Sequence, residues 1–303
     1  MRILFITATR LGDAVISTGL LERLRHTYPD ARFTIACGPV AAGLFQRMPG
    51  LDQIIVMTKR RYDLHWFHLW RQCVFTRWDL IVDLRGSGTS FFLRSRRRRI
   101  MRGGRRAGSR LAHVGQLFDL VPPPMPTVWM STEDVAKART VLGRQPVIAF
   151  GPTANWSGKV WPADHFIALW DALSKARPDI RLAVFYGPGE TERRMAAPLL
   201  AIPGVVNAGG CFTLAETAAM LSLCTLFVGN DSGLMHLAAA AGTLTLGLFG
   251  PSKASEYAPG GRHAEWIAAP GPEGEAPIAG LRTEAVADRI LGMLSVIAAE
   301  PKP

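Results

Sequence analysis

The stretch TLFVGNDSGLMHLAAAAGTLTLGLFG, residues 225–250, contains the change of pattern that decides the fold. Its first apolar run ends at Asn230, and an alanine-rich segment of helical composition begins at Gly233. Asp231 and Ser232 stand between the two, where a helix needs a capping residue. A second apolar run follows at residues 244–249. The order strand, helix, strand is typical of a parallel sheet whose strands are connected by helices.

The same alternation extends along the chain on both sides of this stretch. Apolar runs that predict further strands lie at residues 2–7, 31–37, 52–57, 78–84, 146–152 and 181–187. Segments that predict helices lie at residues 10–29, 40–48, 163–178, 190–201, 213–224 and 282–300. Between the halves, LVPPPMP at residues 120–126 excludes a helix and marks the start of a linker. We therefore predict an α/β protein of two doubly wound domains, residues 1–143 and 144–303, that face a central cleft.

Positive charge is concentrated in the first half of the chain. The formal net charge is +11, and residues 1–145 contain 24 lysines and arginines against 10 acidic residues, whereas residues 146–303 contain 11 against 14. The excess peaks in RSRRRRIMRGGRRAGSR, residues 94–110, which has nine arginines in seventeen positions. This block is either a solvated basic loop or a surface that binds a polyanion, such as nucleic acid, an anionic membrane or a phosphorylated substrate. Because arginines at this density repel one another, we favour polyanion binding.

The helix that begins after Asn230 is a candidate phosphate site. Its free N–H groups and its dipole attract an anion, and Gly233 allows a ligand to approach the backbone closely. His236 lies four residues after Ser232, on the same side of the helix. The alternative is an ordinary capped helix that carries a core histidine, and the local pattern does not separate the two.

Two other loops follow predicted strands. TANWSGKVWP, residues 153–162, carries Thr153 and Lys159, and a lysine after glycine at a strand end is a plausible phosphate contact, although the spacing is not that of a nucleotide-binding P-loop. The loop after the first strand has Gly12 and Asp13 but no G-x-G-x-x-G. Asp13 is either the N-cap of the next helix or a carboxylate that acts as a general base.

The sequence predicts no metal site. The seven histidines show no spacing typical of metal ligands, and there is no D-x-D pair to hold a magnesium diphosphate. The four cysteines form no C-x-x-C pair, which favours scattered, mostly buried thiols in a reducing compartment.

Taken together, these motifs resemble glycosyltransferase family 9, the ADP-heptose:lipopolysaccharide heptosyltransferases. The resemblance runs through almost the whole chain and is most specific in NDSGLMHLAAA and LFGPS, residues 230–240 and 248–252. The opening RILFITATRLGDAVISTGLLERLRHTYPDARFTIA, the segment WDLIVDLRGSGTSFFLRS and the loop GPTANWSGKVWPADHFIAL are similar to other parts of the family. One departure is the turn in AAAAGTLTLGLFG, which lacks the usual proline.

The resemblance implies a GT-B fold, with an N-terminal acceptor-binding domain and a C-terminal nucleotide-sugar-binding domain whose last helix, about residues 282–299, returns to the first domain. It implies an inverting transfer of heptose from ADP-heptose to a lipopolysaccharide inner-core acceptor, without metal or other cofactor. By the same resemblance Asp13 is the catalytic base and Lys159 contacts the donor phosphates. The remaining donor-site residues that it implies are Thr153, Asp231, Ser232, Gly233, His236 and one of Glu190 and Glu192.

The arginines Arg94, Arg96, Arg97, Arg98 and Arg99 are then expected on the acceptor side, against anionic lipopolysaccharide or the anionic inner membrane. With no secretory signal and no run of about 20 apolar residues, we expect a cytoplasmic enzyme, peripheral on the inner membrane. One alternative is a family member that transfers another sugar to another glycan or lipid. A second is a nucleic-acid-binding protein that uses residues 94–110, but the block lacks interleaved aromatics and the chain has no helix-turn-helix or RNP pattern, so we expect no nucleic-acid partner.

Overall fold

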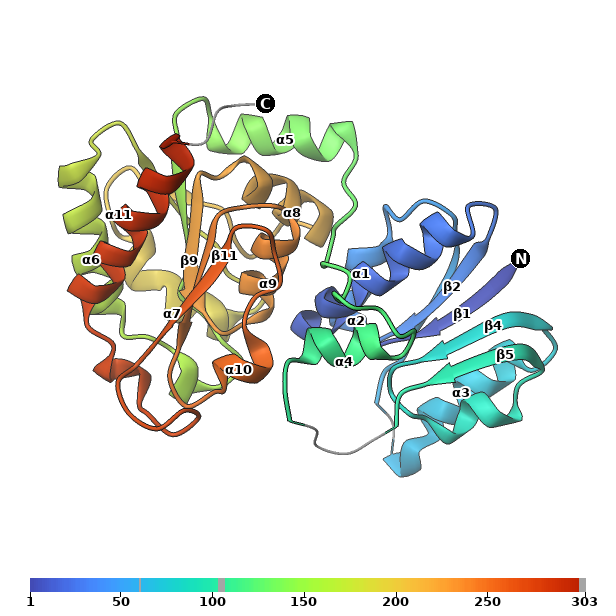
Figure 1. Ribbon diagram of the computed structural model, residues 1–303. Helices are drawn as coiled ribbons and strands as arrows, with labels where there is room; N and C mark the ends of the chain where they lie inside the picture. Colours follow the sequence, from blue (N-terminus) through green and yellow to red (C-terminus); the bar gives the residue numbers. More distant parts are fainter. Residues whose placement is uncertain (60, 103–106, 300–303) are drawn as a thin grey trace. The chain divides into compact units, whose positions relative to one another are not determined.

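The computed structural model describes residues 1–59, 61–102 and 107–299, and the chain divides into two compact units, Met1–Ser131 and Thr132–Pro303 (Figure 1). Each unit contains one sheet in which every strand pair is parallel. The predicted α/β class with two doubly wound sheets is confirmed.

The first unit has a five-stranded sheet of order β3-β2-β1-β4-β5. Its strands are β1 (Arg2–Ile6), β2 (Arg32–Cys37), β3 (Leu51–Val56), β4 (Trp78–Asp83) and β5 (Ser95–Ile100). Its helices are α1 (Leu11–Thr27), α2 (Pro39–Phe45), α3 (Leu64–Cys73) and α4 (Arg110–Gln116), with short 3₁₀ turns η1 (Arg61–Asp63) and η2 (Gly88–Phe92).

The central strands of this sheet are apolar at every position because both faces are covered. Leu4 and Ile6 of β1 pack with Leu69 of α3 in one buried cluster. Ile3 and Phe5 alternate with them, so they point to the opposite face, and they are equally buried. Burial on both faces explains why the strands read as continuous rather than alternating apolar runs.

The proline-rich segment after residue 120 belongs to the first unit. The Thr127 amide donates to Thr18 Oγ1 at 2.9 Å, and Trp129 Nε1 donates to Glu22 Oε2 at 3.1 Å, both on α1. Gly19 permits this contact, since a Cβ there would lie 2.3 Å from the Pro124 carbonyl oxygen. The segment is therefore a strap along α1, and the chain passes to the second unit only after Ser131.

The second unit has a six-stranded sheet of order β11-β10-β9-β6-β7-β8. Its strands are β6 (Val147–Gly151), β7 (Arg181–Val184), β8 (Val206–Asn207), β9 (Leu226–Asn230), β10 (Thr245–Phe249) and β11 (Ala264–Ala268). Its helices are α5 (Thr132–Leu142), α6 (Ala163–Ala176), α7 (Glu190–Leu200), α8 (Leu214–Leu223), α9 (Gly233–Ala240), α10 (Ala254–Tyr257) and α11 (Thr283–Ala299), with 3₁₀ turns η3 (Ser157–Lys159) and η4 (Ile278–Gly280).

Helix α5 places the boundary between the units earlier than the predicted 143/144. It packs against α8, and Lys137 donates to Glu216 Oε1 at 2.5 Å across the two helices. The predicted boundary placed residues 132–142 in the first domain, because the sequence analysis did not predict a helix there. At the other end of the chain, α11 packs against α6 of its own unit.

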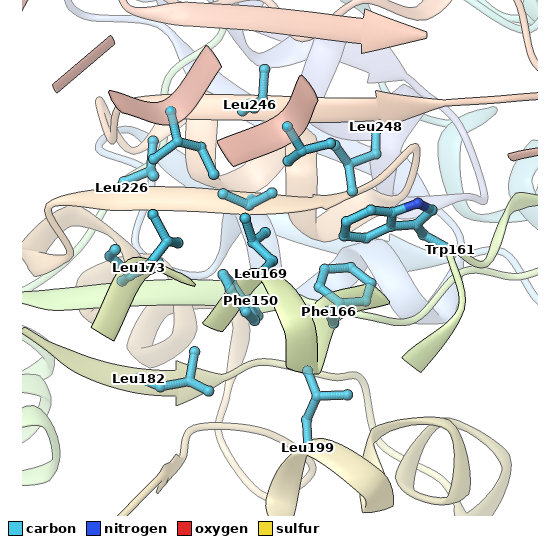
Figure 2. Packing of buried hydrophobic residues seen from close by; sticks show 14 of the residues in the cluster. Phe150, Trp161, Phe166, Leu169, Leu173, Leu182, Leu199, Leu226, Leu246 and Leu248 are labelled. Carbon is cyan, nitrogen blue, oxygen red and sulfur yellow. The ribbon is translucent and has the colours of Figure 1, made fainter. Parts of the chain in front are cut away.

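On one face of its sheet, the core of the second unit includes α6 and the loop that precedes it. Phe166, Leu169 and Leu173 recur at helical spacing and are buried against β6 and β9 (Figure 2). Trp161 is fully buried beside Phe166, and its Nε1 donates to the Leu281 carbonyl at 2.9 Å (Figure 2). The loop after β6 is therefore anchored at its far end by a large aromatic residue.

The first part of the arginine block is a strand rather than a loop. Ser95–Ile100 forms β5, the outer strand of the first sheet, paired in parallel with β4. The other arginines of the block are Arg94 before the strand, Arg102 after it and Arg110 at the start of α4, while Arg105 and Arg106 lie outside the described residues. Among the described residues, no helix is both long and apolar enough to span a bilayer.

Candidate functional site

The order of strands places a candidate ligand site at one position of the second sheet. Strands β6, β7 and β8 run outward on one side of the sheet, and β9, β10 and β11 run outward on the other, so the direction of connection reverses between β6 and β9. In open parallel sheets, ligands bind beyond the carboxyl ends of the strands at this switch point. The loops after β6 and β9 carry Thr153, Lys159, Asp231 and Ser232, four of the residues that the sequence singled out.

An ion pair connects these two loops. Lys159 Nζ donates to Asp231 Oδ2 at 2.5 Å, and both side chains are largely withdrawn from solvent. The ammonium also lies 5.9 Å from the ring centroid of Tyr257, at the end of α10. Lys159 is thereby held over the switch point by an acidic partner and an aromatic one.

Three buried polar atoms that follow β9 or β10, or end β9, have no hydrogen-bond partner in the described part of the chain. Ser232 is the N-cap residue of α9, but its side chain makes no capping bond and its Oγ is buried without a hydrogen-bond partner among the described residues. The same holds for Asn230 Nδ2, although Asn230 Oδ1 accepts from the Trp161 amide at 3.1 Å, and for Ser252 Oγ after β10. Buried polar groups are nearly always paired, so three unpaired ones at one end of one sheet indicate a site for a polar ligand.

The first turn of α9 adds the features of an anion site. Gly233 is its first residue, and the helix follows β9 with only Asp231 and Ser232 between them. His236 lies one turn into the helix and is buried. His236 is therefore a core residue, as the alternative interpretation predicted, but the Ser232 side chain does not cap the helix. The start of the helix presents its dipole at the switch point, and a phosphate there stays a prediction.

The two glutamates between which the sequence did not choose, Glu190 and Glu192, have different partners in the structure. Glu192 Oε2 accepts from Thr153 Oγ1 at 2.9 Å and from the Gly187 amide at 2.6 Å. Glu190 instead forms an exposed ion pair with Arg194 at 3.2 Å. Glu192 therefore joins the loop after β7 to the loop after β6, whereas Glu190 faces solvent.

Asp13 lies in the first turn of α1, beyond the carboxyl end of β1. The N-cap residue of this helix is Arg10, so the interpretation of Asp13 as the N-cap is wrong. Asp13 is half-buried, and no described residue forms a hydrogen bond or ion pair with it. This position is near the positive end of the helix dipole.

Asp83 is a buried carboxylate that the sequence analysis did not single out. At the end of β4 it accepts from the Arg85 and Ser87 amides at 2.9 Å, from Ser87 Oγ at 2.7 Å and from Ser90 Oγ at 2.9 Å. The signal was an aspartate at a strand end followed by RGSGTS. Its role in the structure is to fix the loop beside β1.

Four of the five arginines of the predicted polyanion surface are divided between the two faces of β5, and Arg94 precedes the strand. Arg98 donates from Nε to the Ser90 carbonyl at 3.0 Å and from Nη2 to the Leu93 carbonyl, so it holds η2 in place. Arg96 pairs with Asp79 at 3.4 Å. On the other face, the Arg99 guanidinium lies 5.7 Å from the ring centroid of Phe118. No described residue forms an ion pair or hydrogen bond with the side chain of Arg94 or Arg97, and an anionic ligand for them stays a prediction.

The described residues contain no group of three or more His, Cys, Asp and Glu side chains that could hold a metal ion. Cys37, Cys73 and Cys224 are buried, and burial raises the pKa of each thiol to about 12. Cys211 is exposed and is also a free thiol. The expected pattern of mostly buried, unpaired thiols is confirmed.

Two Rossmann-like units, with a polar cluster at the switch point of the second, define the GT-B class of glycosyltransferase fold. The chain belongs to glycosyltransferase family 9 (heptosyltransferase), whose sequence profile matches residues 110–277, more than half of its length. It is therefore an enzyme that transfers a glycosyl group. The matched region includes every predicted donor-site residue from Thr153 to His236, and it begins after Asp13 and β5.

Individual relatives agree with this assignment. The chain is 26% identical over 299 residues to lipooligosaccharide heptosyltransferase 2 of Haemophilus influenzae, with 86% of each chain covered. Its fold is similar to that of the E. coli ADP-heptose lps heptosyltransferase II, with a TM-score of 0.79 and 21% identity over 99% of this chain and 100% of that one. For the E. coli heptosyltransferase WaaC with ADP, the TM-score is 0.72 and the identity 18%, over 97% and 100% of the two chains. The resemblance to family 9 and the predicted GT-B fold are confirmed.

Proposed function

We propose that this enzyme transfers a heptose from ADP-heptose to the inner core of lipopolysaccharide, with inversion at the anomeric carbon and without a metal ion. The observation that carries the proposal is the Lys159–Asp231 ion pair beside the unpaired Ser232 hydroxyl, at the switch point of a family 9 chain. The names of the relatives support the sugar and the acceptor.

On the donor side, the diphosphate lies against the start of α9. Its negative charge is met by the first-turn amides from Gly233 onward, by the Ser232 hydroxyl and by the Lys159 ammonium. Glu192, held by Thr153 and Gly187, accepts hydrogen bonds from the ribose hydroxyls. His236 supports the floor of this site from inside α9, and Asp231 orients Lys159.

In the chemical step, the acceptor hydroxyl oxygen attacks the anomeric carbon from the face opposite the diphosphate. The new glycosidic bond forms as the bond from the anomeric carbon to the phosphate oxygen breaks, and ADP leaves with the electron pair. Asp13 takes the proton of the acceptor hydroxyl. Charge grows on the departing ADP, and each preorganised donor that meets this charge lowers the barrier by about 3 kcal/mol.

The acceptor is anionic in this proposal, and the first unit binds it. Arg94, just before β5, and Arg97 within it have side chains without a described partner, and they contact the phosphates or carboxylates of the acceptor. The enzyme works in the cytoplasm, at the inner membrane surface where such an acceptor is anchored.

Mass spectrometry of a transfer reaction tests the proposal. ADP-heptose and a heptose-deficient lipopolysaccharide core should give a product heavier by one heptose, and the rate should not change with EDTA. Asp13→Asn should retain ADP affinity in calorimetry and lose turnover by a factor of about 10²–10⁴. Unchanged turnover in Asp13→Asn would remove Asp13 from the role of base, and transfer only from another nucleotide sugar would replace heptose in the proposal.

A further inference from the structure

The first unit exposes a group of phenylalanines that neither its core nor the proposed reaction uses. They are Phe67, Phe75, Phe91 and Phe92, exposed by 59%, 94%, 66% and 75%, and we call them the phenylalanine patch. Every phenylalanine that is exposed within the described residues belongs to it. Exposed aromatic side chains gathered in this way mark an interaction surface.

Contacts through Trp70 connect Phe67 with the turn that carries Phe91 and Phe92. The Phe67 ring stacks on Trp70 with centroids 5.6 Å apart, and Trp70 Nε1 donates to the Phe92 carbonyl at 3.3 Å. Helix α3 and turn η2, which carry these residues, pack against each other. Phe91 is the neighbour of Phe92 in η2, so aromatic side chains from two segments share one surface.

The outer face of α3 extends the apolar surface. Leu64, Phe67 and Arg71 are separated by three and four residues, which places them on one side of the helix. Leu64 is exposed like Phe67, while Leu69 and Cys73 face the core. Phe75 follows directly after the C-cap residue Val74. The helix therefore buries Leu69 and Cys73 on one side and exposes the apolar side chains of Leu64 and Phe67 to solvent on another.

Arginines border the phenylalanine patch. Residues 61–102 contain ten arginines and three acidic residues, and one of the acids, Asp83, is buried. Arg98 is bonded to the Ser90 and Leu93 carbonyls on either side of Phe91 and Phe92, so the basic strand β5 lies directly beside the aromatic turn. A second copy of the chain would bring like charges together at this surface, which opposes self-association.

We propose that the phenylalanine patch docks the first unit on an anionic lipid bilayer, with the aromatic rings inserted at the headgroup boundary and the arginines of α3 and β5 against the lipid phosphates. Apolar insertion and attraction to anionic headgroups together give stable but reversible attachment. The proposal concerns the first unit alone and does not depend on which sugar the enzyme transfers.

Vesicle flotation of the full chain tests the docking. The wild-type protein should float with vesicles of phosphatidylcholine and phosphatidylglycerol, and only weakly with phosphatidylcholine alone. Raising the salt concentration should weaken this binding without abolishing it, because the apolar part is not screened. The double variant Phe91→Ser/Phe92→Ser should bind at least about tenfold more weakly, since a factor of ten is about 1.4 kcal/mol and burial of even part of two rings exceeds this.

Matched variants separate docking from loss of folding. Leu291→Ser removes an exposed leucine on α11 of the second unit and should float like the wild type. The Phe91→Ser/Phe92→Ser protein should bind ADP in calorimetry with wild-type affinity. Lipids with brominated acyl chains should quench tryptophan emission, and Trp70→Phe should reduce the quenching because Trp70 touches two members of the patch.

Three results would overturn the docking proposal. One is equal flotation of the wild type and the double serine variant. A second is absence of wild-type flotation together with a self-association that the serine substitutions abolish, which would assign the patch to contacts between copies. The third is a phenylalanine-dependent gel shift with single-stranded nucleic acid and none with vesicles.

Discussion

The ammonium of Lys159 lies 2.5 Å from the carboxylate of Asp231, and the two residues come from the loops after adjacent strands of the second sheet. A lysine that is largely withdrawn from water needs a counter-charge, and Asp231 supplies it. In the proposed function, a donor phosphate at the start of α9 competes for the same ammonium. The pair therefore fixes the orientation of Lys159 in the ligand-free protein, so the proposed reaction needs little reorganisation at this residue.

Substitution of Lys159 separates its charge from its structural role. Lys159→Met should lower kcat/KM by a factor of about 10²–10³ and should also lower the melting temperature, because Asp231 is left buried without a partner. The double variant Lys159→Met/Asp231→Asn should recover the melting temperature and not the rate. Transfer assays and thermal denaturation measure the two effects, and recovery of the rate in the double variant would limit Lys159 to a structural role.

Ser232→Ala should have opposite effects on stability and on binding. The Ser232 hydroxyl is buried without a described partner, so its removal should leave the ligand-free protein as stable as before or more stable. ADP should bind more weakly by about 1 kcal/mol, which calorimetry resolves. Ser222→Ala is the matched control, since Ser222 Oγ already donates to the Ala219 carbonyl at 2.8 Å. That variant should lose a little stability and keep full ADP affinity; the same ADP loss in both would argue against a ligand contact at Ser232.

The two glutamates of α7 should differ in their effect on ADP binding. In Glu192→Gln, an amide replaces the carboxylate that accepts from Thr153 and Gly187, and ADP affinity should fall by about tenfold through lost charge-assisted bonds. Glu190→Gln removes only an exposed ion pair with Arg194 and should leave the affinity unchanged. Calorimetric titration of both variants with ADP makes the comparison. A larger loss in Glu190→Gln than in Glu192→Gln would reverse the assignment.

The attachment of α5 to α8 should depend on pH. Lys137 and the Thr213 amide both donate to Glu216, and the Lys137 hydrogen bond is the main cause that holds the pKa of this carboxyl below its ordinary value of 4.5. A carboxyl with a lowered pKa stabilises the folded state above its ordinary pKa, and this contribution is lost as the pH falls through the lowered value.

Glu216→Gln should therefore cost about 0.5 kcal/mol near neutral pH, and the difference from wild type should vanish in acid. Denaturant unfolding at several pH values measures this difference. Glu275→Gln, an exposed carboxyl without a described partner, is the control. A difference that stayed constant below pH 4 would show that the charge of Glu216 does not stabilise the fold.

The sequence predicts the elements that are buried on both sides. Strands such as Val147–Gly151 and Leu226–Asn230 are continuous apolar runs because helices cover both faces of the sheet, and this pattern is local. Their order also predicts that Lys159 and Asp231 lie at the same sheet end, since carboxyl ends of parallel strands share one edge.

Elements at the margins of the sheets escape prediction because their pattern depends on distant partners. Strand β5 has the sequence SRRRRI, which lacks the apolar alternation of a strand. It forms a strand because its backbone pairs with the open edge of β4. Helix α3 was not predicted either, and it exposes Leu64 and Phe67 to solvent while Leu69 and Cys73 face the core. Nor does the sequence choose between Glu190 and Glu192, because that choice depends on the turn at Gly189, whose φ of 122° only glycine adopts readily.

Strand β5 also affects the tendency of the protein to self-associate at high concentration. An outermost strand of a parallel sheet presents unpaired amides and carbonyls, a template on which another chain can add a strand. In this protein that rim carries four consecutive arginines, Arg96–Arg99, so two rims that meet edge to edge repel each other before their backbones can pair. In the second sheet, the outer strand β8 is only two residues long, so it offers little backbone for another chain to pair with. The arginines of β5 therefore also protect against aggregation, and their replacement by apolar residues should first reduce the solubility of the protein.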